Sequence, residues 1–269
     1  MASHADRTTT VSMPKRRVVL LGASNLTRCF SHVWSIVNRP ESAGREILVA
    51  MGHGRSYGQA SRLFVRRLPG IVECDIWSTI AQNAALPTTA LLTDIGNDVF
   101  YDVPLDRLLD WVEICLGRLF AAGAEVSMSL PPVCNLPTLS RGRFYAARCV
   151  LFPHCRMTYD QAINRVWELH ERLKTLGRRD RVRLIDPRRG WYGLDPIHFT
   201  RHGARQAWSE LLAPLQPTET RGTHATLRQH HEDLRSARRR PQRRWLLGIE
   251  QTTRQPVGCF DNGTTLSIF

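Results

Sequence analysis

The chain has 269 residues, of which 42% are hydrophobic, and a formal net charge of +13. This length suits one α/β domain with additions, and the hydrophobic content suits a globular fold. The sequence has no apolar stretch long enough to span a bilayer and no evident secretory signal, and its seven scattered cysteines argue for reduced thiols rather than a disulfide framework. We therefore expect a cytoplasmic protein without a membrane span.

The region from residue 16 to residue 216 alternates strand and helix patterns, and we expect it to form one domain. Strands are predicted at residues 18–21, 46–50, 89–95, 125–130 and 181–185, and helices at residues 26–37, 59–67, 106–121, 159–176 and 200–212. Alternation of this kind implies a parallel sheet that is covered by helices on both faces.

The two ends of the chain differ from this region. Residues 1–15 are polar and are expected to form a disordered tail. Residues 217–269 are basic and have no clean hydrophobic period, so we expect an appendage that is poorly ordered or loosely docked. Its arginines, concentrated between Arg235 and Arg244, suit a weak contact with a polyanion. A solvated basic surface is the alternative, since no nucleic-acid motif accompanies the charge.

The connection from residue 133 to residue 156 is too long for a plain linker in a compact domain. It contains aromatic and arginine side chains, and it begins at the carboxyl end of a predicted strand. We interpret it as a flap that shapes a binding site, with a disordered excursion as the alternative.

Ser24 follows a buried-type apolar strand and the two small residues Gly22 and Ala23, and it precedes a predicted helix. Open parallel sheets bind ligands at this end of their strands, and the N–H groups of a helix N-terminus favour developing negative charge. Ser24 is therefore a candidate nucleophile. A simple helix N-cap is the alternative.

Asp195 and His198 are separated by two residues in the loop before the last predicted helix. Within one turn they can form a direct hydrogen bond, and the carboxylate would then fix the imidazole tautomer and stabilise its protonated form. A capping Asp with an incidental His is the alternative, because many chains contain this spacing by chance.

Two further segments follow predicted strands. Asn97 lies just past an apolar run, in Gly96-Asn97-Asp98, where a side-chain amide can donate to an oxyanion. Residues 51–58 contain three glycines, which let a backbone approach a ligand closely. Ordinary turns are the alternative for both segments.

Taken in chain order, Ser24, Gly58, Asn97 and His198 resemble the four blocks of the SGNH/GDSL hydrolase superfamily. The resemblance covers residues 17 to 212. It implies a flavodoxin-like α/β fold of three layers with a five-stranded parallel sheet. It also implies Ser24, His198 and Asp195 as a catalytic triad, with an oxyanion hole formed by Ser24, Gly58 and Asn97.

Two details of this resemblance are specific to the chain. Gly58 is preferred to Gly54 as the block-two glycine because a helix is predicted directly after it. The first block reads Gly22-Ala23-Ser24, whereas the family usually has an Asp before the serine. The triad does not use that Asp, so its absence bears on local hydrogen bonding and on substrate rather than on the chemistry.

The resemblance implies an enzyme that cleaves a small-molecule acyl ester through an acyl-enzyme intermediate, without a metal or organic cofactor. An acyltransferase with the same triad is the nearest alternative. A non-catalytic binding or interaction module on the same fold is a second alternative, since a fold does not establish a function.

Overall fold

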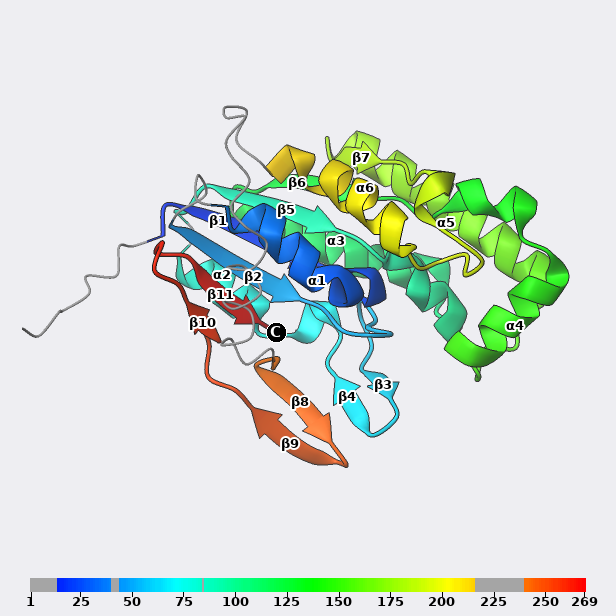
Figure 1. The fold of residues 1–269 in the computed structure, drawn as a ribbon, viewed down its shortest axis with the longest axis horizontal. Helices are drawn as coiled ribbons and strands as arrows, with labels where there is room; N and C mark the ends of the chain where they lie inside the picture. The colour runs from blue at the N-terminus through cyan, green and yellow to red at the C-terminus, as the bar shows by residue number, and fades with distance from the viewer. Residues whose placement is uncertain (1–13, 40–43, 84, 216–239) are drawn as a thin grey trace, which may run out of the picture.

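The computed structural model of the chain describes residues 14–39, 44–83, 85–215 and 240–269 (Figure 1). A central sheet has seven strands in the order β10-β11-β2-β1-β5-β6-β7. Its strands are β1 (Arg16–Leu21), β2 (Arg45–Ala50), β5 (Thr88–Leu92), β6 (Glu125–Ser129), β7 (Arg183–Ile185), β10 (Gly258–Cys259) and β11 (Thr265–Ile268). Neighbouring strands are parallel, except for the antiparallel pair β10 and β11.

Helices cover both faces of this sheet and complete three layers. α1 (Ser24–Val37) and α6 (Arg201–Leu212) lie on one face; α2 (Ile76–Gln82), α3 (Leu105–Ala121) and α5 (Tyr159–Arg179) lie on the other. In β1, Val18 and Leu20 pack towards the α1 face, whereas Val19 and Leu21 pack towards the α3 face. A strand buried on both sides requires the continuous apolar run seen in the sequence. The predicted three-layer α/β fold is confirmed, but the predicted number of five strands is wrong.

A second, smaller sheet has four antiparallel strands in the order β3-β4-β8-β9. They are β3 (Ser61–Leu63), β4 (Arg66–Leu68), β8 (Arg243–Leu246) and β9 (Ile249–Thr252). The helix predicted at residues 59–67 is therefore wrong. Its apolar residues face solvent at a hairpin turn instead of a core, and pairing of β4 with β8, far away in sequence, sets the local conformation.

The C-terminal segment extends both sheets. β11 pairs in parallel with β2, and Leu266, Ile268 and Phe269 are buried. The buried guanidinium of Arg55 donates to the Phe269 carbonyl oxygen. The prediction of a loosely docked appendage is thus wrong for residues 240–269, because alternate residues of β11 enter the core. The remainder of that prediction, residues 217–239 with the arginines up to Arg239, and residues 1–13 of the predicted tail lie outside the described residues.

Short helices occupy the connections between the main elements. The connection after β6 forms η4 (Val133–Thr138) and α4 (Arg141–Leu151) and lies at the carboxyl edge of the sheet (Figure 1). The other short helices are η2 (Ile71–Glu73), η3 (Ile95–Tyr101), η5 (Arg189–Trp191) and η6 (Ala213–Leu215). Over the described ranges, the helices include none with the length and apolar character needed to cross a bilayer. All seven cysteines are free thiols.

Candidate active site

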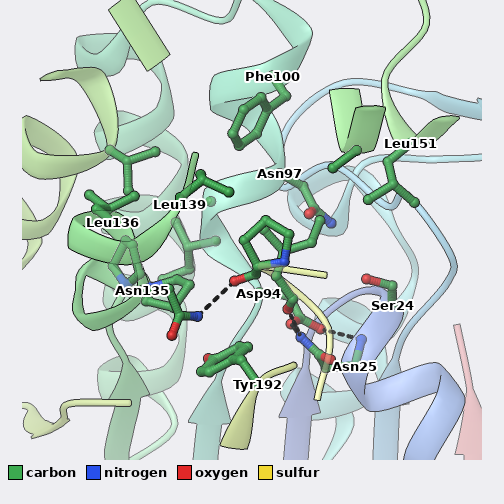
Figure 2. A pocket seen from close by; sticks show the side chains of 18 of the residues that line it. Ser24, Asn25, Asp94, Asn97, Phe100, Asn135, Leu136, Leu139, Leu151 and Tyr192 are labelled. Atoms are coloured by element: carbon green, nitrogen blue, oxygen red, sulfur yellow. Dashed lines mark hydrogen bonds between the residues drawn. The ribbon is translucent and has the colours of Figure 1, made fainter. Parts of the chain in front are cut away.

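The predicted site residues occupy loops at the carboxyl edge of the central sheet. Ser24 begins α1, Asn97 belongs to η3, and Asp195 and His198 lie in the loop that precedes α6. Because β1 and β5 are adjacent and parallel, the segments after them emerge side by side. Figure 2 shows Ser24 and Asn97 facing the same pocket.

Ser24, His198 and Asp195 form a continuous hydrogen-bonded chain. The Ser24 Oγ lies 2.9 Å from His198 Nε2, and His198 Nδ1 lies 2.6 Å from Asp195 Oδ2. With Nδ1 donating to the carboxylate, Nε2 is left to accept the proton of the serine hydroxyl. Ser24 and His198 are both buried, which limits competition from water for these bonds. The structure thus brings together the three residues in an arrangement that can transfer a proton from serine to imidazole.

Asp195 is held in its ionised form by its neighbours. Partial burial acts to raise its pKa, but hydrogen bonds from His198 and from the N–H groups of Ile197 and His198 outweigh burial, so that the pKa is lowered. An ionised carboxylate at this position favours the protonated imidazole that forms when serine loses its proton.

Asp94 takes up the hydrogen bonds at the turn that carries the serine (residues 22–26, the serine turn). Its Oδ2 accepts from the N–H groups of Ala23, Asn25 and Leu26 at 2.9, 3.1 and 3.4 Å. A carboxylate at a helix N-terminus satisfies free N–H groups and interacts favourably with the helix dipole. Asp94 therefore satisfies N–H groups next to Ala23, the position where the resemblance leads one to expect an Asp.

Asn25 joins the serine turn to the loop that carries the histidine. Its Nδ2 donates to Asp94 Oδ1 at 2.8 Å and to the Ile197 carbonyl at 2.9 Å, and its Oδ1 accepts from the Phe199 N–H at 3.0 Å. Asn25 thus binds the backbone on both sides of His198. Sequence reasoning missed Asn25 and Asp94. The only signal for Asn25 was its position directly after the serine.

A second asparagine holds the same loop from the other side of the pocket. Asn135, in η4, donates from Nδ2 to the Pro196 carbonyl at 2.8 Å (Figure 2). From α4, the Arg143 guanidinium donates to the carbonyls of Gly193 and Leu194 at 3.1 and 2.6 Å. The connection after β6 therefore fixes the loop that precedes His198.

Two hydrogen-bond donors at the site lack an acceptor within the described residues. The side-chain Nδ2 of Asn97 is buried and unpaired, and the N–H of Ser24 has no acceptor. Buried polar groups are nearly always hydrogen-bonded, so an unpaired donor in a pocket indicates a site for a ligand oxygen. Asn97 and Ser24 accordingly have the properties of oxyanion donors.

Gly58 already has a hydrogen-bond partner within its own loop. Its N–H is directed at the Ser56 Oγ, 3.2 Å away, and a Cβ at this position would lie 1.8 Å from the Trp111 ring. Close packing against Trp111 is thus why residue 58 is a glycine. Because the Gly58 N–H already has a partner, the structure favours another donor for the predicted oxyanion hole, and the helix on which the choice of Gly58 rested is absent, because β3 follows instead.

Residues 51–60, the glycine loop, are fastened to η3 by Asp98. The Ser56 hydroxyl donates to Asp98 Oδ1, and the Tyr57 N–H donates to Asp98 Oδ2 at 3.0 Å. Burial raises the pKa of Asp98 to about 6, although both hydrogen bonds oppose the shift. In the same loop, the Gly54 carbonyl accepts from the Tyr101 hydroxyl at 2.8 Å. The Gly54 N–H has no acceptor in the part of the chain that the structure describes.

The pocket in front of the serine is apolar. It has a volume of about 90 Å³. Its hydrophobic wall is built by η3, η4, α4 and the loop after β6, and includes Phe100, Leu130, Leu136, Leu139, Phe144, Leu151 and Phe152. Residues of the predicted flap thus line the pocket, in agreement with a role in shaping it. In the described part of the chain, no group of three or more His, Cys, Asp or Glu side chains is arranged to hold a metal ion.

Comparisons with known proteins find likeness in structure only. No family model matches the chain, and no curated protein matches it. A GDSL-like lipase from Bacteroides thetaiotaomicron is similar over 75% of this chain and 87% of its own, with 12% identity and a TM-score of 0.46. The esterase EstA from a Pseudoalteromonas species is similar over 73% and 94%, with 11% identity and a TM-score of 0.45. A third solved chain, 12% identical, reaches a TM-score of 0.50 over 76% of this chain and 98% of its own.

At such low identity, the likeness concerns the arrangement of the backbone. Acylhydrolases, esterases and lipases, some of them of the G-D-S-L kind, are the proteins named among these matches. The three-layer α/β fold that the resemblance implied is present in this chain, and the third solved chain shares its backbone arrangement.

Proposed function

We propose that this chain is a serine hydrolase that cleaves acyl esters through an acyl-enzyme intermediate. The observation that carries the proposal is the hydrogen-bonded chain from Ser24 through His198 to Asp195, which opens onto an apolar pocket. No other serine in the described residues has a hydrogen bond to a histidine ring nitrogen. A serine hydroxyl is a weak nucleophile unless a neighbouring base accepts its proton.

The first half of the reaction uses the triad as follows. Ser24 Oγ attacks the ester carbonyl carbon while His198 Nε2 takes the hydroxyl proton, and Asp195 stabilises the imidazolium that forms. The tetrahedral intermediate then collapses. The bond to the leaving alkoxide breaks, His198 donates its proton to that oxygen, and the acyl group remains on Ser24.

In the second half, water replaces the alcohol. His198 accepts a proton from water, the resulting hydroxide attacks the acyl carbon, and collapse of the second tetrahedral intermediate returns the proton to Ser24 Oγ. The acid product leaves, and the enzyme is restored. An acyltransferase differs only in using a second alcohol in place of water at this step.

Negative charge on the carbonyl oxygen needs donors in both halves. We assign this role to the Ser24 N–H and the Asn97 side chain, both of which lack other partners among the described residues. In place of Gly58, we propose the Gly54 N–H as the third donor, since the glycine loop that carries it is fastened to the Asn97 helix by Asp98 and Tyr101. Fixed donors at the position of developing charge are worth much more than water, which must reorient.

The pocket also restricts the substrate. A small cavity walled by aliphatic and aromatic side chains favours an apolar acyl group of a few carbons over a charged or sugar-like one. We place the acyl half of the ester in this cavity and the alcohol half outside it. We therefore expect aryl esters of short acyl chains to be turned over faster than those of long chains.

A fluorophosphonate probe tests the proposal directly, because it reacts with an activated serine and carries its own mass tag. The wild-type protein should be labelled at Ser24, and Ser24→Ala should not be labelled. Ser129→Ala is the matched control, since Ser129 lines the same pocket without a hydrogen bond to His198. Absence of labelling in the folded wild-type protein would indicate a binding module. Labelling combined with faster transfer to an added alcohol than to water would indicate an acyltransferase.

A further inference from the structure

Large apolar side chains are exposed at the end of the smaller sheet, far from any core. Phe64 is 88% exposed and Leu247 is 72% exposed, and three further apolar neighbours are also exposed. We call this set the tip patch: Leu63, Phe64, Val65, Leu247 and Ile249. Single exposed apolar residues are common on protein surfaces, but five gathered at one place indicate an interaction site.

The tip patch is assembled from two hairpin turns that are distant in sequence. One turn joins β3 to β4 and the other joins β8 to β9, and the Leu247 N–H donates to the Val65 carbonyl at 2.9 Å. Both Phe64 and Leu247 have a φ of 52°, a turn conformation in which large apolar residues are unusual. In Figure 1 the smaller sheet extends away from the helical layers. The backbone therefore presents the two apolar turns together at one projecting end.

Arginines surround the tip patch. The strands behind the turns carry Arg62, Arg66, Arg67, Arg243 and Arg244, which we call the arginine collar. Within the described residues, only Arg243 of these five is paired with a carboxylate, that of Asp75 at 3.8 Å. The guanidinium carbons of Arg67 and Arg243 lie 5.4 and 5.7 Å from the centre of the Trp245 ring. The end of the sheet is thus apolar at its extremity and cationic just behind it.

We propose that the tip patch docks this protein on the surface of a bilayer that contains anionic lipids. The apolar side chains of the two turns would enter the boundary between headgroups and acyl chains, and the arginine collar would contact lipid phosphates. Trp245 lies at the level between the two, where tryptophan is favoured at membrane interfaces.

Other occupants account for only part of this surface. Two copies of the chain that met through the tip patch would bring two arginine collars together, and like charges oppose that contact. Five side chains on two turns also form a small area compared with a stable dimer interface. A nucleic acid would satisfy the arginines but would leave Phe64 and Leu247 in water. An anionic bilayer satisfies the apolar and the cationic parts together.

Vesicle binding of the full-length protein tests the proposal independently of catalysis. Co-sedimentation should be strong with vesicles of mixed phosphatidylcholine and phosphatidylglycerol, weak with phosphatidylcholine alone, and reduced by added salt. Phe64→Asn together with Leu247→Asn should lower the partition coefficient by about tenfold. Asparagine tolerates a positive φ, so both turns should be retained. Val150→Asn, at an apolar residue that is 79% exposed on α4, is the matched control and should bind like wild type.

The charge contribution is tested in the same assay. Arg62→Gln together with Arg67→Gln should weaken binding to the anionic vesicles several-fold, whereas Arg178→Gln, an exposed arginine on α5, should not. The proposal is overturned if the wild-type protein ignores anionic vesicles, or if the tip variants bind as well as Val150→Asn. Loss of a concentration-dependent dimer in the tip variants, with vesicle binding unchanged, would identify the tip patch as a contact between copies and would also overturn it.

Discussion

Two carboxylates in the segment after β5 hold the two sides of the proposed site: Asp94 holds the serine turn and Asp98 holds the glycine loop. They differ in burial and in the number of hydrogen bonds that they accept. Asp94 is partly exposed and accepts four hydrogen bonds from the serine turn. Asp98 is fully buried and accepts two from the glycine loop. The segment after β5 thus positions both sides of the proposed site, with Asn97 between the two carboxylates. Changes on the two sides should consequently differ in what they affect: the position of the triad on one side and the anchoring of the glycine loop on the other.

The largest effect is expected from the triad itself, where the serine turn meets the histidine loop. Ser24→Ala and His198→Ala should each lower kcat on an aryl acetate by at least about 10⁴-fold, because either loss removes the activated nucleophile. The double variant should be no worse than either single one. Multiplied losses in the double variant would mean that the two residues act separately.

The next effect concerns the residue between the two carboxylates. Asn97→Ala should lower kcat by about 10²–10³-fold, equivalent to about 3–4 kcal/mol, with a smaller change in KM, since an oxyanion donor acts mainly in the transition state. Asn97→Asp, of the same shape, should not restore activity, because a carboxylate cannot donate. A change in KM alone would make Asn97 a ground-state binding or turn residue.

The glycine loop should show a dependence on pH that comes from Asp98. The pKa of Asp98 is raised from 3.8 to about 6 in the folded protein. Between these values the folded state holds a proton that the unfolded state has released. The stabilising contribution of this group is therefore fully present below about pH 4 and is lost as the pH rises through about 6.

Asp98→Asn removes that titration. Urea denaturation gives the free energy of unfolding of wild type and of the variant at each pH. The wild-type value minus the variant value should fall by up to about 3 kcal/mol as the pH rises from about 4 to about 6. Asp160→Asn, at an exposed ion pair with Arg141, is the control and should run parallel to wild type. If the free energy of unfolding of Asp98→Asn also changed with pH as that of wild type does, the pKa of Asp98 would not be raised.

The sequence predicted those parts of the molecule that depend on local pattern. Continuous apolar runs identified the buried strands. Ser24 and Asn97, in the segments after two such strands, were chosen as candidates because parallel strands end at one edge. Asp195 and His198 were chosen as candidates because they are three positions apart, close enough for a direct hydrogen bond within one turn.

Contacts between distant segments could not be predicted in this way. β11 has only two apolar residues in alternation, Leu266 and Ile268, and its place beside β2 depends on a partner more than 200 residues earlier. The same applies to β4, which is a strand because β8 pairs with it. Gly58 was chosen for a helix that does not form, and its packing against Trp111 has no local signal.

The smallest effect is expected at Asp94, on the serine turn. Asp94→Asn keeps the shape of the side chain and one acceptor oxygen for the backbone N–H groups. Its amide would, however, face the Asn25 amide, donor against donor, where Oδ1 now accepts at 2.8 Å. Asn25 would then bind the Ile197 carbonyl and the Phe199 N–H less firmly, and His198 would lose part of its fixed position.

We expect about a tenfold loss of kcat for Asp94→Asn with little change in KM, which corresponds to about 1–2 kcal/mol for one unsatisfied polar contact. The rate of fluorophosphonate labelling should fall in parallel, since it reports the activated serine without a bound substrate. Asp94→Ala should be worse in both activity and melting temperature, because it leaves the N-terminus of α1 without its carboxylate. If Asp94→Asn lowered the melting temperature but not the labelling rate, Asp94 would stabilise the fold without positioning the triad.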